Sequence, residues 1–281
     1  MSVPFKLDIK GFCPICQQET VYTANHHWLR GSLECKSCPG TSVPRERALA
    51  LVLNREAPDW RNLAIHESSP AGRGISLVMR QQCALYTGTH FYPGEPLGSM
   101  VPLPHSNGNI SFRNENIEQQ TFKDESFDLV VTLDVFEHVF NPDKMITEIH
   151  RTLRPGGLYI STFPIRKYQA EAIKARARQL ENGEIEHLAE PEYHGNPIDQ
   201  KGSLVTYDYG YDIHQKIAEW ADFEVEILRF ADRRAGVLGE YTDVIVCRKP
   251  GSSVDLRGSQ AAPKAPSSST PSQPAFRTGF R

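Results

Sequence analysis

One continuous run of apolar and β-branched residues, at positions 129–133, constrains the fold of this chain more than any other feature. Polar and apolar residues do not alternate within it, which is typical of a strand covered on both faces of a sheet. Asp134, Glu137 and His138 follow directly, and a Gly-Gly turn lies at positions 156–157. In open α/β sheets, ligands bind beyond the carboxyl ends of the strands. The sequence therefore predicts an α/β fold with a site where this strand ends.

Length and charge limit the class of protein. The chain has 281 residues, enough for one substantial α/β domain and one small module. Its formal net charge of −3 argues against a dominant nucleic-acid surface, which is normally basic. No apolar run approaches the roughly 18 residues that span a bilayer, and positions 1–10 lack the apolar core of a secretory signal. We therefore expect a cytoplasmic protein without a membrane partner, and a nucleic-acid partner is disfavoured. The sequence does not indicate an oligomeric state.

Four cysteines near the N-terminus predict a metal site. They form two C-x-x-C pairs separated by 18 residues, which is the spacing of a zinc ribbon. The four are Cys13, Cys16, Cys35 and Cys38. Four thiolates complete a tetrahedral shell and leave no open position, so the expected zinc ion is structural and not catalytic. Free thiols or redox pairs are the alternative, and a reducing compartment favours metal binding over disulfides.

A helix is predicted directly after the cysteines, over residues 44–53. Apolar residues recur there at helical spacing, and Ser42 is a suitable N-cap. Arg45 and Arg47 have two interpretations. They contact an anionic group of a substrate, or they belong to a solvated helix start.

The rest of the chain alternates between strand and helix patterns. We expect strands at 63–66, 83–87, 110–113, 127–133, 158–163, 223–229 and 241–247, and helices at 76–82, 143–153, 168–181 and 212–221. A loop rich in glycine and proline covers 92–108, and an irregular insertion covers 187–206. The segment from Pro250 onward is rich in Ser, Pro, Ala and Gln, so disorder is expected there.

Four short segments carry a resemblance to a known family: DLVV at 128–131, EHV at 137–139, NPD at 141–143 and LRPGG at 153–157. They resemble class I S-adenosylmethionine (SAM)-dependent methyltransferases of the type 11-like group. From about residue 12 to about residue 248 the chain is similar to bacterial methyltransferases with an N-terminal zinc ribbon. The resemblance implies a Rossmann-like seven-stranded sheet and SAM as cofactor. It divides the chain into a zinc ribbon (10–42), a connecting helix (43–60), a Rossmann-like methyltransferase domain (61–249) and a disordered tail (250–281).

The resemblance also implies where the cofactor binds. Glu67 occupies the place where the first motif of the family opens with an acidic residue. Glycines usually follow, because a side chain would block the approach of the backbone to the ligand. Here Ser69 stands at one glycine position and Gly72 is displaced by one. Because the replacements are small, a compact turn is still expected here.

Further cofactor contacts are expected at other strand ends. Relatives tend to have an acidic residue where His90 stands; His90 either bonds the ribose or is only a loop residue. Asn116 and Ile117 lie where relatives hold adenine, and an amide suits adenine while the aliphatic chain packs on the ring. Asp134 is expected beside the methionine moiety, where it orients the ammonium group or caps the following helix.

Two histidines are candidates for catalysis. Methyl transfer to a hydroxyl needs a base, because the hydroxyl proton must leave. His138 follows the central strand, and His194 lies in a His-Gly-Asn-Pro turn of the insertion. The alternatives are an orienting role for His138 and a turn hydrogen bond for His194.

Three functions are consistent with the sequence. The first is a SAM-dependent methyltransferase that modifies oxygen or nitrogen of a small molecule or glycan. The second is a catalytically decayed methyltransferase fold that acts as a binding or scaffold protein, which the altered glycine pattern and His90 favour. The third is a nucleic-acid or protein methyltransferase that reads its substrate with the ribbon, although the ribbon carries few basic residues.

Overall fold

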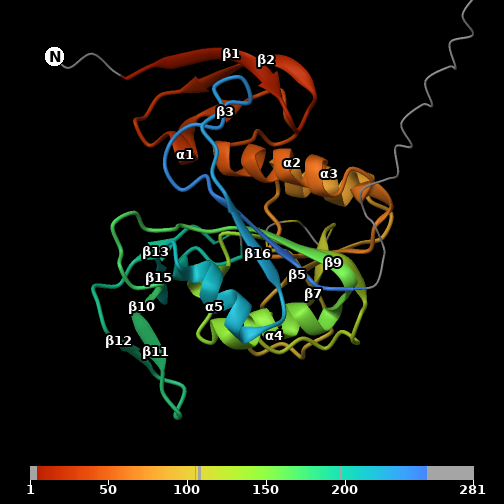
Figure 1. Cartoon of the computed structure of the whole chain (residues 1–281), viewed down its shortest axis with the longest axis vertical. Coiled ribbons are helices and arrows are strands. Elements are labelled where there is room, and N and C mark those ends of the chain that lie inside the picture. Colours follow the sequence, from red (N-terminus) through yellow and green to blue (C-terminus); the bar gives the residue numbers. More distant parts are fainter. Residues whose placement is uncertain (1–4, 105, 107–108, 197, 252–281) are drawn as a thin grey trace, which may run out of the picture.

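A mixed eight-stranded sheet forms the centre of the protein in our computed structural model, which describes residues 5–104, 106, 109–196 and 198–251 (Figure 1). The expected tail from residue 252 onward lies outside these residues. The strand order is β16-β17-β9-β8-β4-β5-β7-β6. In that order the strands are β16 (Glu224–Leu228), β17 (Val244–Arg248), β9 (Leu153–Thr162), β8 (Phe127–Leu133), β4 (Ile65–Ser68), β5 (Tyr86–His90), β7 (Ser111–Asn114) and β6 (Met100–Pro102).

Five neighbouring strands, from β9 to β7, run parallel and place their carboxyl ends at one edge of the sheet. β4 is the central strand, and Ile65 is in register with Tyr86 of β5 and Leu129 of β8. β17 is antiparallel to both of its neighbours, and β6 is antiparallel to β7. The residues that follow β4, β5 and β8 therefore meet at the same edge, as expected for a ligand site in a parallel sheet.

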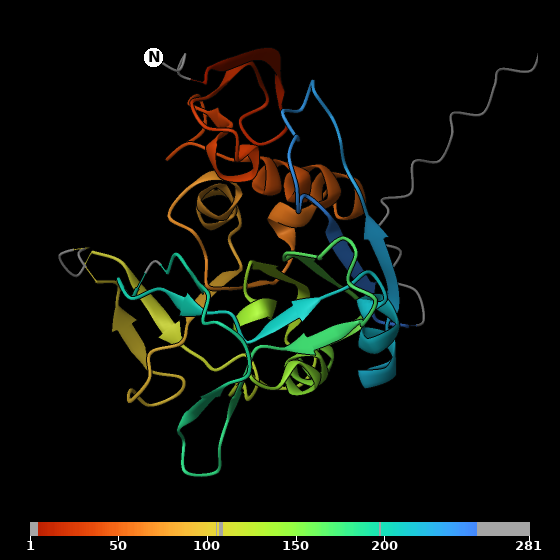
Figure 2. The same ribbon diagram turned by 90° about the vertical axis from the view of Figure 1, so that its left-hand side faces the viewer.

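Helices cover both faces of the sheet (Figures 1 and 2). The helices α2 (Pro44–Glu56) and α3 (Gly74–Gln82) share a hydrophobic core with one face, to which Val131 and Ile160 belong. The helices α4 (Pro142–Thr152) and α5 (Ile213–Trp220) share a second core with the other face. Two short 3-10 turns, η1 (Trp60–Asn62) and η2 (Phe136–His138), precede β4 and follow β8. No helix in that part of the chain is both long enough and apolar enough to cross a bilayer.

The N-terminal residues 7–42 form a small three-stranded antiparallel sheet, which we call the cysteine module. It consists of β1 (Leu7–Cys13), β2 (Gln18–Ala24) and β3 (Glu34–Cys35), with the single-turn helix α1 (Leu29–Ser32) between the last two strands. The loop between β16 and β17 rises beside this sheet (Figure 1), and the amide of Phe12 donates a 2.8 Å hydrogen bond to the carbonyl of Arg234 there.

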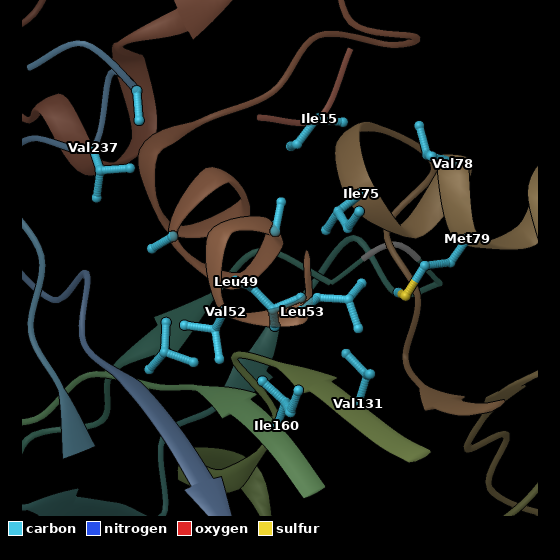
Figure 3. Packing of buried hydrophobic residues seen from close by; sticks show 14 of the residues in the cluster. Ile15, Leu49, Val52, Leu53, Ile75, Val78, Met79, Val131, Ile160 and Val237 are labelled. Atoms are coloured by element: carbon cyan, nitrogen blue, oxygen red, sulfur yellow. The ribbon is translucent and has the colours of Figure 1, made fainter. Parts of the chain in front are cut away.

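Helix α2 lies between the cysteine module and the central sheet. Leu49, Val52 and Leu53 are fully buried in one cluster with Val131 and Ile160 of the sheet (Figure 3). The same cluster includes side chains of the cysteine module. The cysteine module and this face of the central sheet therefore share a single hydrophobic core.

Arg47 of α2 connects the cysteine module to the loop between β16 and β17. Its side chain is fully buried, and its guanidinium donates to the carbonyls of Ser42 (2.6 Å), Leu33 (2.8 Å) and Gly236 (2.7 Å). It also lies over the ring of Tyr22. The interpretation of Arg47 as a solvated residue or a substrate contact is wrong, because every one of these partners is structural.

The strands and helices around the Leu129 run were predicted with the correct order, and α4 is shifted by one residue from the prediction. Two predictions nearby are wrong. The sheet has eight strands and not seven, because β6 lies inside the expected loop 92–108. The N-cap of α2 is Val43 and not Ser42: Glu46 accepts from the Val43 amide, while Ser42 accepts from Arg47.

The expected basic helix over 168–181 is also wrong. The segment contains two short strands, β10 (Ile173–Ala175) and β11 (Ala177–Gln179). β11 pairs with β12 (Ile185–His187) in a hairpin that extends away from the sheet (Figure 2), and β10 pairs with β15 (Tyr207–Tyr209). The backbone of the segment is extended although its composition is typical of a helix, because β10 pairs with β15. Arg176 also forms a 3.0 Å ion pair with Asp208 of β15. The irregular insertion also carries the short pair β13 (Tyr193–His194) and β14 (Ser203–Leu204).

The shared core predicts a cooperative response to a core substitution. Replacing Leu49 by alanine removes buried methyl groups between the module and the sheet, and the free energy of unfolding should fall by about 2–5 kcal/mol. Leu51→Ala, on the less buried side of the same helix, is the matched control and should cost less. Urea unfolding followed by circular dichroism measures both. Two separated transitions, one for each part, would contradict a shared core.

Candidate functional site

A cavity of about 1360 Å³ opens at the carboxyl edge of the parallel strands. Ligand pockets are roughly 300–1,000 Å³, so the space is large enough for more than one small molecule. Its walls come from the turn after β4, from the ends of β5 and β8, from the insertion and from the cysteine module. Eight of the residues predicted for the site line it: Ser69, Gly72, His90, Asn116, Ile117, Asp134, His138 and His194.

The turn after β4 has an unusual backbone. Ser69 stands in a left-handed conformation, φ +56°, where a glycine would be unstrained. Its amide donates a 2.7 Å hydrogen bond to the carbonyl of Thr89, which holds it there. Gly74 also has a positive φ of +55°, and a Cβ at this position would overlap the carboxylate of Glu46. A Cβ at Gly72 would meet no atom within 4 Å, so this glycine leaves open space toward the cavity.

Glu67 is not among the cavity-lining residues. Its carboxylate is fully buried beneath the turn and accepts hydrogen bonds from Ser76 (2.5 Å) and Tyr86 (2.7 Å). Burial raises its pKa to about 7 although both hydrogen bonds oppose this. In the protein as observed, Glu67 anchors the turn to α3 and β5.

His90 ends β5 and lies against the edge of the Phe112 ring, at a centroid distance of 4.7 Å. Burial lowers the pKa of His90 to about 4, so the imidazole is neutral at pH 7. Its Nε2 is buried and has no hydrogen-bond partner in the described chain. An unpartnered polar atom in a buried position is costly, and a ligand hydroxyl in the cavity would remove that cost.

Asn116 and Ile117 follow β7 on the same side of the cavity. The side-chain oxygen of Asn116 accepts a 3.0 Å hydrogen bond from the amide of Glu118, which fixes the side chain. Ile117 is buried except for the small part of its surface that faces the cavity. The two residues thus present one amide and one apolar surface to a common space.

Asp134 directly follows β8 in a left-handed conformation, φ +53°. Its carboxylate forms ion pairs with Arg30 (2.6 Å) and Arg45 (2.8 Å). Burial favours a raised pKa, but the two guanidiniums outweigh it and hold the pKa of Asp134 at about 2. The alternative that Asp134 caps the following helix is wrong, because Val135 is the N-cap of η2 and no side chain bonds there.

Glu137, His138 and His194 form a second titratable cluster on the cavity wall. Glu137 Oε1 lies 3.4 Å from His194 Nδ1 and 3.7 Å from His138 Nε2. Both Glu137 oxygens are buried, and neither accepts a hydrogen bond of good geometry from the described residues. One ligand atom from each of the three residues lies within 4.8 Å of the others. The cluster therefore combines a buried carboxylate with two imidazoles that face it.

The two histidines differ in their surroundings. His138 Nδ1 is 2.8 Å from the carbonyl of Leu204, so this nitrogen carries the proton and Nε2 is free of it in the neutral ring. His194 is more exposed and also contacts Glu192 at 3.2 Å. Glu137, followed by Glu192, raises the pKa of His194 above its ordinary value.

The four predicted metal ligands are brought together. Cys13 Sγ is 3.4 Å from Cys38 Sγ, and Cys16 Sγ is 3.9 Å from Cys35 Sγ. All four sulfur atoms lie within 4.8 Å of one another. A tetrahedral zinc ion with Zn–S bonds of about 2.3 Å requires sulfur atoms roughly 3.8 Å apart. The donor set fits a zinc ion.

Several cavity residues were missed by sequence reasoning. Arg30, Trp28 and Tyr241 line the cavity, but Arg30 and its partner Asp134 are 104 positions apart, and nothing local marks the pair. Glu137 was noticed beside His138 without a role. Its position three residues after Asp134 at the end of β8, next to a histidine, was the available signal.

Residues 72–161 of the chain match the family described as "Methyltransferase domain". The ubiquinone biosynthesis O-methyltransferase of Agrobacterium fabrum is 30% identical over 136 residues, which is 45% of this chain and 54% of that protein. The ubiquinone/menaquinone biosynthesis C-methyltransferase of Hydrogenovibrio crunogenus is 42% identical over 50 residues, which is 18% of this chain and 20% of that protein. The chain thus spans about half the length of the first of these relatives and a fifth of the second.

Among solved structures, the chain matches a SAM-dependent methyltransferase from Mesorhizobium loti. It is 14% identical, with a TM-score of 0.46 over 72% of this chain and 98% of that chain. The 1,6-didemethyltoxoflavin-N1-methyltransferase of Burkholderia thailandensis is 16% identical, with a TM-score of 0.42 over 73% of this chain and 79% of that chain.

Loss of one cysteine should release the metal. Cys35→Ser removes one of the four thiolates, so the purified protein should hold much less than one zinc ion per chain, and its thermal unfolding midpoint should fall. Elemental analysis and calorimetry measure the two effects. Cys83→Ser, a buried cysteine outside the cluster, is the control and should keep its zinc. A Cys35→Ser protein with full zinc content would show that these thiols do not bind the ion.

Proposed function

We propose that this protein is a SAM-dependent methyltransferase that transfers a methyl group to a hydroxyl of a small-molecule or glycan acceptor. One observation carries the proposal. The segment that matches a methyltransferase domain, residues 72–161, contributes many of the residues around a large cavity at the carboxyl edge of a parallel sheet. The name of the Agrobacterium relative, an O-methyltransferase, supports oxygen as the acceptor atom.

The cavity offers suitable partners for each part of the cofactor. The open space at Gly72 and the bent backbone at Ser69 would receive the methionine end. His90 Nε2 would bond a ribose hydroxyl, and Asn116 with Ile117 would hold adenine. Bound SAM would supply an activated methyl group, and the chain would supply its position, because in-line transfer depends mainly on orientation.

His194 is the proposed base for the acceptor hydroxyl. Its pKa is raised by Glu137 and Glu192, so the neutral ring is a stronger base than an ordinary histidine. The imidazolium formed after proton transfer would be stabilised by the same two carboxylates, 3.4 and 3.2 Å away. His138 is the proposed positioning residue, because its Nδ1 hydrogen bond to Leu204 fixes the insertion that carries His194.

The cysteine module is proposed to hold a structural zinc ion. The four sulfur atoms would occupy all four coordination positions of the zinc ion, so none would be left for a substrate. All six cysteines are free thiols in the structure. A reducing compartment such as the cytoplasm keeps thiols available for metal, which is consistent with the expected location.

Binding of S-adenosylhomocysteine (SAH), the demethylated cofactor, tests the proposed activity first. Isothermal titration calorimetry should detect saturable binding to the wild-type protein. Gly72→Leu should weaken binding strongly, because its side chain enters the open space, while its unfolding midpoint stays unchanged. Gly72→Ala is the graded control and should have a smaller effect. Absence of binding to the wild type at millimolar SAH would favour the scaffold function.

The pH dependence tests the base. Because the pKa of His194 is raised, its ring loses its proton at a higher pH than an ordinary histidine, so the rate of methyl transfer should rise with pH as the ring is deprotonated. Glu137→Gln removes the main cause of the raised pKa, so the acidic limb should move to lower pH and the maximal rate should fall. His194→Asn should lower the rate by about 10²–10⁴-fold.

Two measurements check this: an NMR titration of the His194 ring, which needs no acceptor, and methyl transfer from labelled SAM to acceptors found by screening. His187→Asn, at an exposed histidine in the neighbouring hairpin, is the control. An unchanged His194 pKa in Glu137→Gln would exclude the proposed coupling.

A further inference from the structure

The end of β8 carries more positive than negative charge. Asp134 provides one carboxylate, and both of its oxygens bind guanidinium groups, of Arg30 at 2.6 Å and of Arg45 at 2.8 Å. One carboxylate neutralises one of the two cations. The group of three therefore has a formal charge of +1.

This charge lies in a confined space. The side chains of Arg30, Arg45 and Asp134 are only 9%, 19% and 17% exposed, and all three line the cavity. A buried charge is costly unless it is paired. The charges of Glu137 and Glu46 also act on Arg30 and Arg45, but both carboxylates have partners of their own: Glu46 pairs with Arg73 at 2.8 Å, and Glu137 faces two histidines.

Both arginines come from outside the sheet. Arg30 belongs to α1, between the two C-x-x-C pairs, and its Nε donates a 2.9 Å hydrogen bond to the carbonyl of Tyr241. Arg45 belongs to the first turn of α2 and bonds the carbonyl of Arg30. Their position in the cavity therefore depends on the docked cysteine module.

We propose that Arg30 and Arg45, held by Asp134, form an anion site that binds a carboxylate of a ligand in this cavity, and that the cysteine module thereby completes the functional site. The inference rests on the proposed function, because the carboxylate would belong either to the amino-acid end of the cofactor or to the acceptor. Ser69 and Gly72, where the methionine end of the cofactor is proposed to lie, line the same cavity as the two arginines.

The first arm of the experiment tests the cofactor as the source of the carboxylate. Calorimetry compares SAH with its decarboxylated analogue, which keeps every other group. Wild-type protein should bind SAH about 10–100-fold more tightly, as expected for a charge-assisted hydrogen bond. Arg45→Gln should reduce this ratio to near one without changing the affinity for the analogue. An equal loss for both ligands would indicate a merely structural role for Arg45 and would overturn a cofactor carboxylate site.

The second arm tests the acceptor as the source. Acetate is added to the SAH-saturated protein at constant ionic strength, with chloride as the reference, and the shift in unfolding midpoint is measured. If Arg45→Gln leaves the ratio of SAH affinity to analogue affinity unchanged, the carboxylate belongs to the acceptor. Acetate should then raise the unfolding midpoint of the wild type but not that of the variant. If Arg45→Gln changes neither the ratio nor the acetate shift, the anion site is wrong.

Arg154→Gln is the matched control. Arg154 pairs with Asp128 at 2.7 Å, at the opposite end of the same strand, and does not line the cavity. It should leave the ratio and the acetate shift unchanged. If the proposed function is wrong, the wild type should bind neither SAH nor its analogue. The anion site can then still be tested, because acetate should raise the unfolding midpoint of the ligand-free wild type and not that of Arg45→Gln.

Discussion

The packing of helix α2 between two sheets is the constraint on which the rest of the structure depends. Leu49, Val52 and Leu53 are fully buried against the central sheet, and Arg47 on the same helix bonds carbonyls of the cysteine module and of the β16–β17 loop. The helix that we expected to connect two units is thus the centre of one continuous core. Because the core is continuous, the cysteine module has a fixed position over the carboxyl edge of the sheet, and its arginines can contribute to the cavity.

Elements with a strong local pattern were predictable from the sequence. The run at 127–133 has apolar or β-branched residues at its buried positions, and it forms β8 with the expected bounds. The Asn-Pro start of α4 and the spacing of the four cysteines are local signals of the same kind, and both were confirmed in position. Eight of the nine predicted cofactor and catalytic residues line the cavity, and most of them follow strands whose carboxyl ends must meet in a parallel sheet.

Elements fixed by distant contacts were not predictable. Residues 168–181 have a helical composition, but Arg166 and Arg176 are bonded to Asp208, and strand pairing with β15 determines the backbone. Tertiary contacts of this kind, strand pairing above all, override local propensity. The same reason explains why Arg30 was missed and why Arg47 was misinterpreted. Each acts through partners that are far away in the sequence, and a single sequence gives no indication of those partners.

Contacts between residues that are distant in the sequence also explain the altered glycine pattern after β4. Glu46 of α2 binds Arg73 and the amide of Val43, and it leaves no space for a side chain at Gly74. The amide of Gly74 in turn bonds the carbonyl of Pro39 in the cysteine module. A turn that is free in solution needs glycines to adopt its shape, whereas a turn held by tertiary contacts can keep that shape with a strained Ser69. The turn is therefore held at both ends by different partners. The Thr89 carbonyl of β5 holds Ser69, whereas α2 and the cysteine module hold Gly74, where glycine is still required.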